Sequence, residues 1–148
     1  MSAEAWDAVR VFVLRVITLL APQTWSAAEK HLPRSTNLAG FAPMLQPEQI
    51  AYLGIRDIDL FEENLIVKRG IFARTMDEWN DDGILTGLKA ALAHLVSTGV
   101  DAIHLSFDVD VLDPGIFPGT GTRYPGGLTI REASQVLRYL GTWTDVPI

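Results

Sequence analysis

The sequence of 148 residues contains no cysteine, which excludes a disulfide framework and any metal site built from thiolates. It has no run of basic residues, and a net charge of −6 gives little basis for binding nucleic acid. The apolar run at residues 11–21 is too short to cross a bilayer and is interrupted by Arg15. These absences fit a cytoplasmic protein without a nucleic-acid or membrane partner.

The N-terminal part of the chain gives few structural signals after its first helix. Residues 4–21 carry apolar side chains at helical spacing, which predicts an amphipathic helix that packs on a core. Residues 22–48 are rich in proline, serine, glycine and asparagine and are interpreted as a connecting segment. His31 lies in this segment, and we expect it at the surface.

From residue 49 the chain alternates between strand and helix patterns. Apolar runs at 50–55, 71–76 and 102–107 predict strands. Helices are predicted at 60–68, from a cap at Asp77 to Gly99, and from a capping box at Thr129 and Glu132 to Gly141, with a further strand at 143–148. This alternation predicts an α/β fold with three layers, α/β/α, and a mostly parallel sheet.

Acidic residues follow two of the predicted strands. Asp108 and Asp110, two apart after the strand at 102–107, are expected to point to the same side. Paired carboxylates at a strand end suit a hard cation, although a lone Asp-X-Asp is more often an acidic turn. Asp113 is interpreted as a residue that shapes the turn. The carboxyl ends of parallel strands share one edge, so residues 56–59 and 108–113 should lie on one rim.

The stretch from Ser106 to Glu132 contains SFDVDVLDP, then PGTGT, then GGLTIRE. It closely resembles a signature of the ureohydrolase family of arginases, agmatinases and formimidoylglutamases, and most resembles arginase. The segment GIRDIDLFEENL likewise resembles an arginase stretch, GLRDVDPGEHYI. The resemblance covers residues 37–148 as a partial arginase-like α/β domain, and residues 1–36 are not matched to the family.

The resemblance implies a hydrolase that uses two manganese ions to release urea from a guanidino group, as in L-arginine. On this match Asp108 bridges both metal ions and Asp110 binds one of them. Asp59 and Glu62 correspond to carboxylates that hold the α-amino end of the substrate, and Thr122 lies near the guanidinium. An equal alternative for Glu62 is a charged helix start.

Two other family signatures, one like G-G-D-H and the metal-binding D-A-H-x-D, do not occur in this sequence. We therefore expect a truncated arginase-like chain with an incomplete sheet, weak manganese binding and no activity alone. One alternative is a catalytically dead protein that binds a partner or self-associates. Another is an agmatinase or formimidoylglutamase, and a third is a one-metal hydrolase completed by His31 or His104. We expect His104 in the core and His94 exposed.

Overall fold

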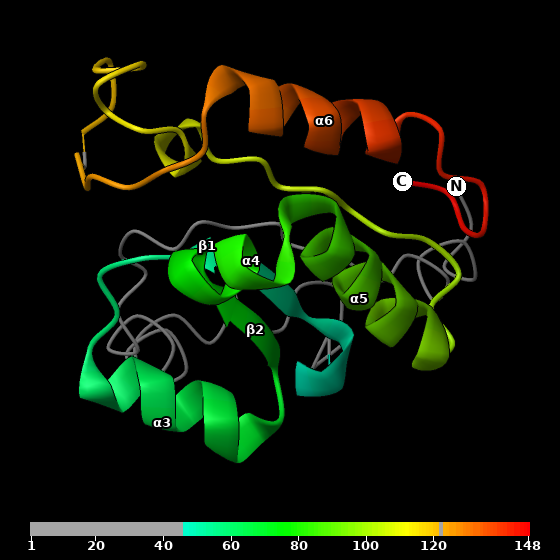
Figure 1. Ribbon diagram of the computed structural model, residues 1–148. Coiled ribbons are helices and arrows are strands. Elements are labelled where there is room, and N and C mark those ends of the chain that lie inside the picture. The colour runs from blue at the N-terminus through cyan, green and yellow to red at the C-terminus, as the bar shows by residue number, and fades with distance from the viewer. Residues whose placement is uncertain (1–45, 122) are drawn as a thin grey trace, which may run out of the picture.

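The computed structural model describes residues 46–121 and 123–148, which fold around a small parallel sheet (Figure 1). The elements, in chain order, are η3 (Pro47–Gln49), β1 (Ala51–Ile55), α3 (Leu60–Arg69), β2 (Phe72–Thr75), α4 (Met76–Asp82), α5 (Ile84–Ser97), η4 (Val109–Val111) and α6 (Ile130–Leu140). The helix predicted at 4–21, and His31, lie outside the described residues. No helix in the described part of the chain is long and apolar enough to cross a membrane.

The sheet is a β-α-β unit. β1 and β2 pair in parallel from Ala51 opposite Phe72 to Leu53 opposite Arg74, with α3 as the crossover between them. α3 covers one face of the sheet, where Ile66 packs with Tyr52, while α4 and α5 cover the other (Figure 1). The strands predicted at 50–55 and 71–76 and the helix predicted at 60–68 are therefore confirmed, as is the parallel pairing.

Gly54 changes the side-chain alternation at the end of β1. The register shifts between Leu53 and Ile55, and Gly54 takes a φ of +78°, a left-handed conformation that favours glycine. As a result Ile55 packs on the α3 side together with Tyr52, instead of on the side of Leu53. A Cβ on Gly54 would also lie 3.0 Å from the terminal methyl of Met76. The irregularity thus sets the direction in which the chain leaves β1.

The single helix expected between Asp77 and Gly99 is two helices, so that prediction is wrong. The N-cap is Thr75, whose hydroxyl accepts a hydrogen bond from the Glu78 N–H at 3.2 Å. The break occurs at Gly83, which has a φ of +86°. Trp79 of α4 is buried, and its indole N–H donates across the break to the Ile84 carbonyl at 2.7 Å. Packing of Trp79 therefore overrides the continuous helical pattern.

Residues 102–107 do not form the predicted strand, since no strand within the described residues pairs with them. Ile103 is buried, whereas His104 is exposed, so its expected core position is also wrong. The strand predicted at 143–148 is absent too, and the Pro147 carbonyl instead accepts a hydrogen bond from the Ile103 N–H at 2.8 Å. A run of apolar residues becomes a strand only where a paired edge is available.

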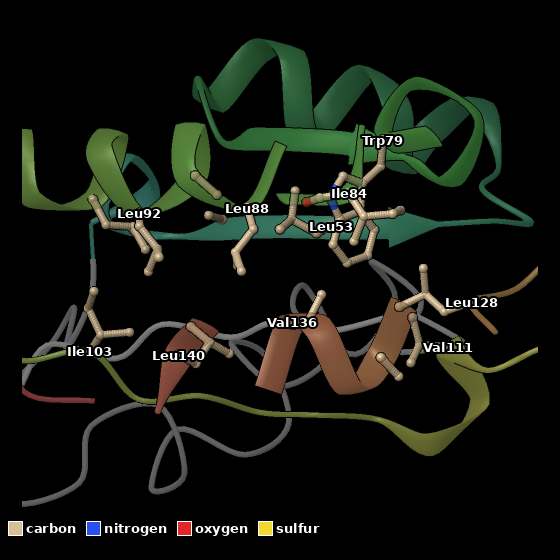
Figure 2. Packing of buried hydrophobic residues seen from close by; sticks show 14 of the residues in the cluster. Leu53, Trp79, Ile84, Leu88, Leu92, Ile103, Val111, Leu128, Val136 and Leu140 are labelled. Atoms are coloured by element: carbon tan, nitrogen blue, oxygen red, sulfur yellow. The ribbon is translucent and has the colours of Figure 1, made fainter. Parts of the chain in front are cut away.

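α6 closes the main core. Its capping box is confirmed, since the Glu132 carboxylate accepts from the Thr129 N–H at 2.8 Å and the Thr129 hydroxyl accepts from the Glu132 N–H at 3.2 Å. Figure 2 shows Val136 and Leu140 of α6 on the opposite side of the core from Leu88 and Leu92 of α5. The same core includes Val111 and Leu128, two apolar residues of the loop that precedes α6.

Candidate functional site

The two acidic segments meet where the end of β1 approaches the long loop between α5 and α6. Arg56 directly follows β1, and its guanidinium donates through Nη2 to the Asp110 carbonyl and through Nη1 to the Tyr124 carbonyl. The guanidinium carbon also lies 6.0 Å from the centre of the Tyr124 ring. The segments 56–59 and 108–113 therefore meet at Arg56 and Asp110, as predicted, but the second segment does not follow a strand of the sheet as expected.

Asp108 and Asp110 lie in a tight turn and not at a strand end. Residues 109–111 form the 3-10 turn η4, and the Asp108 carboxylate accepts a hydrogen bond from the Asp110 N–H at 3.3 Å. Asp110 is buried, with 8% of its surface exposed. The strand alternation on which their shared direction was predicted does not apply in such a turn. Their roles as metal ligands remain a prediction.

Asp113 shapes the loop through backbone contacts, as the sequence suggested. Its carboxylate accepts hydrogen bonds from the Gly115 N–H at 2.8 Å, the Gly126 N–H at 2.8 Å and the Gly127 N–H at 3.3 Å. These hydrogen bonds lower the pKa of Asp113, and the charge of Arg56 contributes in the same direction. Asp113 thus joins the beginning of the loop to its end.

The two ends of the loop touch through their backbones. The Leu128 N–H donates to the Val111 carbonyl at 2.8 Å, and the Asp113 N–H donates to the Leu128 carbonyl at 3.0 Å, which makes an isolated parallel bridge. The approach is so close at Gly127 that a Cβ would lie 2.5 Å from the Val111 carbonyl oxygen. Backbone hydrogen bonds between Val111, Asp113 and Leu128 therefore fix the C-terminal side of the turn that contains Asp108 and Asp110.

Asp59 and Glu62, the predicted substrate carboxylates, form a reciprocal cap on α3. Asp59 Oδ1 accepts hydrogen bonds from the N–H groups of Phe61 and Glu62, both at 2.8 Å, and Glu62 Oε2 accepts from the Asp59 N–H at 3.2 Å. In this structure Glu62 therefore acts at the start of a helix, as the alternative interpretation expected. The substrate roles of Asp59 and Glu62 remain predictions. Thr122 lies outside the described residues.

Arg56 is the residue of this rim that sequence reasoning left without a role. It is half-buried, and burial lowers the pKa of its guanidinium, while the nearby Asp110 and Asp113 oppose that shift. A signal for it was present: an arginine directly after a buried strand and next to an acidic segment. A buried cation is stable only beside anions or acceptors, so such a position predicts a contact with the acidic loop.

The described residues do not by themselves make a site for two metal ions. Within residues 46–121 and 123–148, no group of three or more histidine or acidic side chains could hold an ion. Hard divalent cations require about six oxygen ligands. Of the three histidines in the sequence, His104 is exposed, and His94 contacts the Glu48 carbonyl through Nε2 at 2.9 Å. His94 is thus partly covered, and not the exposed imidazole that was expected.

Comparisons with known proteins agree with this arrangement. The sequence profile of the arginase family matches residues 23–146. This match begins inside residues 1–36, the segment in which the motifs showed no resemblance, and the domain boundary at residue 36 remains a prediction. An arginase from Schizosaccharomyces pombe is 42% identical over 93 residues, which are 63% of this chain and 29% of that protein. The crystal structure of Bacillus subtilis arginase superposes with a TM-score of 0.66 at 34% identity, over 76% of this chain and 39% of that one.

A proclavaminate amidino hydrolase from Streptomyces clavuligerus superposes with a TM-score of 0.68 at 27% identity, over 99% of this chain and 46% of that one. The fold is therefore an arginase-like α/β fold, of which the described residues contain a partial sheet. The chain belongs to the arginase family. It spans 29% to 36% of the length of curated arginases such as those of S. pombe and Brevibacillus brevis.

Proposed function

We propose that this chain supplies part of a manganese-dependent site that hydrolyses a guanidino group, as in L-arginine. In this proposal Asp108 and Asp110 are metal ligands, and Asp59, Glu62 and Thr122 belong to the substrate side. The observation that supports it is the contact of Arg56 with the Asp110 carbonyl, which joins the chain before Asp59 to the acidic loop in a member of the arginase family.

We further propose that the chain alone binds manganese weakly and does not turn over substrate. Two carboxylates on one turn offer fewer ligands than a pair of divalent ions needs. The remaining donors would come from outside the described residues.

A cationic guanidino compound fits the charge of the rim. The chain carries a net charge of −6, and the rim holds carboxylates on both segments. The cap on α3 uses Asp59 Oδ1 and Glu62 Oε2, so the other oxygen of each carboxylate lies outside the cap. Those oxygens can accept hydrogen bonds from an ammonium group without opening α3. The similar proteins named as arginase and amidino hydrolase support substrates with an amidino group.

Manganese binding and urea release test the two parts of this proposal separately. Free manganese can be followed by electron paramagnetic resonance during a titration of the whole chain. We expect weak binding that Asp108→Asn and Asp110→Asn both abolish, while Asp77→Asn, an exposed carboxylate on α4, leaves it unchanged. With L-arginine we expect no urea. Binding unaffected by either loop substitution would refute the assigned ligands, and urea release would refute the inactivity.

A second candidate is a non-catalytic subunit that self-associates. Three large apolar residues on α3 are mostly exposed: Leu60 at 78%, Phe61 at 64% and Val67 at 75%. Leu60 and Val67, seven apart, share one face of the helix. Light scattering after size exclusion would test this candidate. It predicts a dimer that Leu60→Glu converts to monomer, and a wild-type chain that is monomeric at all concentrations would exclude it.

A further inference from the structure

The acidic loop contains three carboxylates within six residues, Asp108, Asp110 and Asp113. Like charges this close in the chain destabilise one another unless a cation or hydrogen-bond donors compensate them. Within residues 46–121 and 123–148, these carboxylates are not part of any group of three or more histidine or acidic side chains placed to hold a metal ion. Among the described residues, the guanidinium of Arg56 reaches this loop from the end of β1.

Arg56 contacts the loop at two places that are distant in the sequence. Nη2 of its guanidinium donates a hydrogen bond to the Asp110 carbonyl in η4, and Nη1 donates to the Tyr124 carbonyl near the end of the loop. Its charge also acts on the carboxylates of Asp110 and Asp113. A planar fork of N–H donors can hold two carbonyls in a fixed relative position, which the single ammonium of a lysine cannot do as well.

Burial of the Arg56 side chain at this place costs free energy, so its other contacts must hold it there. The Nε atom of Arg56 is buried and makes no hydrogen bond within the described structure. A buried donor without a partner opposes folding. The side chain nevertheless stays in this place, and the next residue, Asp57, takes an unusual φ of +41° as the chain turns away toward α3.

We propose that Arg56 is a positioning residue that holds the two ends of the loop between residues 108 and 128 against the end of β1, and that its charge adds to the hydrogen bonds that stabilise the acidic side chains of this loop. The loop is thereby formed before any metal ion arrives. Arg56 also fixes the distance between the turn with Asp108 and Asp110 and the carboxylates on α3, because Asp59 follows it by three residues. This inference concerns the loop itself and does not depend on the manganese proposal.

The test is amide hydrogen exchange, followed by NMR, on the whole chain in wild-type form and as Arg56→Gln. The informative amides are those of Gly127, which donates to Asp113, and Leu128, which donates to Val111. We expect Arg56→Gln to accelerate exchange at these amides at least tenfold. Amides in the centre of α5, such as that of Leu92, should change less than twofold. Equal rates in both proteins, or the same acceleration in α5, would overturn the proposal.

Two further variants separate charge and geometry from general destabilisation. Arg56→Lys keeps the charge and loses the fork, so its loop exchange should fall between wild type and Arg56→Gln. Arg138→Gln removes the same charge from an exposed site on α6 and should leave the loop unchanged. If Arg56→Gln fails to fold, Arg56→Lys decides: selective acceleration in the loop supports the proposal, and uniform acceleration or none contradicts it.

Exchange of the wild-type chain with EDTA and with added manganese distinguishes Arg56 from a bound ion. We expect the loop rates in EDTA to remain those of the untreated protein, because the compensating charge is covalently part of the chain. If EDTA raised the loop rates to those of Arg56→Gln, a metal ion and not Arg56 would hold the loop. That result would overturn this inference while supporting the metal site itself.

Discussion

Residues 50–55 and 102–107 are both short apolar runs, yet only the first contains a strand. β1 pairs with β2, which reaches it through a crossover helix that follows directly in the sequence. Residues 102–107 follow α5 and find no strand beside them within the described residues, although Ile103 is buried. Every residue of β1 is buried, whereas Ile103 is the one buried residue of 102–107, so full burial accompanies the strand pairing that only the first segment has.

The acidic side chains that follow the two segments also differ in the hydrogen bonds that hold them. After β1, Asp59 and Glu62 are held locally, in the cap of a helix that begins at Leu60. After residues 102–107, Asp113 is held by glycine N–H groups more than ten residues away, at Gly126 and Gly127. The first arrangement needs only its own helix, and the second needs the whole loop to be closed. Substitutions in the two regions should reveal this difference.

The largest effect is expected in the core that both regions share. Leu88 is fully buried between β1 and α6, so Leu88→Ala should lower the free energy of unfolding by about 3 kcal/mol. The exposed Leu137 on α6 is the matched control, because Leu137→Ala should change the free energy of unfolding by less than about 0.5 kcal/mol. Urea denaturation measures both. Equal losses would show that α6 does not close the core as described.

Closure of the loop is tested at Gly127. Gly127→Ala places a Cβ 2.5 Å from the Val111 carbonyl, and we expect a loss of about 2 kcal/mol from overpacking. Gly121→Ala is the control, since no heavy atom lies within 4 Å of a Cβ there. Thermal unfolding of the two variants gives the comparison. A harmless Gly127→Ala would mean that the loop ends do not meet.

The local cap on α3 should respond less strongly. Asp59→Ala removes the acceptor for the Phe61 and Glu62 N–H groups and should cost about 1 kcal/mol. Asp59→Asn retains a capping oxygen, so stability should stay near that of the wild type while the charge is lost. Chemical denaturation of both variants decides whether Asp59 acts here as a cap. If both variants lose the same stability, the charge matters more than the cap.

The smallest effect is expected from the titration of Asp113. Its pKa is lowered in the folded chain, so its contribution to stability is complete above the ordinary value of 3.8 and is lost as the pH falls through the lowered pKa. Asp113→Asn should therefore lower stability at neutral pH and flatten the decline below about pH 4. Thermal midpoints measured from pH 2 to 7 provide the check. If the thermal midpoint fell with the same slope below pH 4 in both proteins, this role of Asp113 would be contradicted.

Sequence reasoning succeeded where a structure depends on neighbours in the chain. The parallel pair β1 and β2, the helix ending before Gly70 and the capping box at Thr129 were all predicted from local patterns. It failed where distant residues decide. The break at Gly83 follows from the packing of Trp79, and the turn at Asp108 follows from contacts with residues near 128.

The candidate site was predicted in part for the same reason. The proximity of the two acidic segments was predicted from the rule that parallel strands end at one edge. The contact from Arg56 to the Asp110 carbonyl confirms the proximity but not its expected reason, because residues 102–107 form no strand. The turn geometry of Asp108 and Asp110 was missed because it depends on how the loop closes. The role of Arg56 was missed because its acceptors are carbonyls of residues 54 and 68 positions further on.

The most direct test of the shared rim is a manganese titration observed by NMR, since the paramagnetic ion broadens amide signals near the place where it binds. We expect signals from residues 107–113 to broaden first, followed by those around Asp59, while signals from the centre of α5 stay sharp. The pattern should vanish in Asp108→Asn. Broadening centred on another acidic surface, or no broadening of the loop at any manganese concentration, would contradict the assignment of this rim.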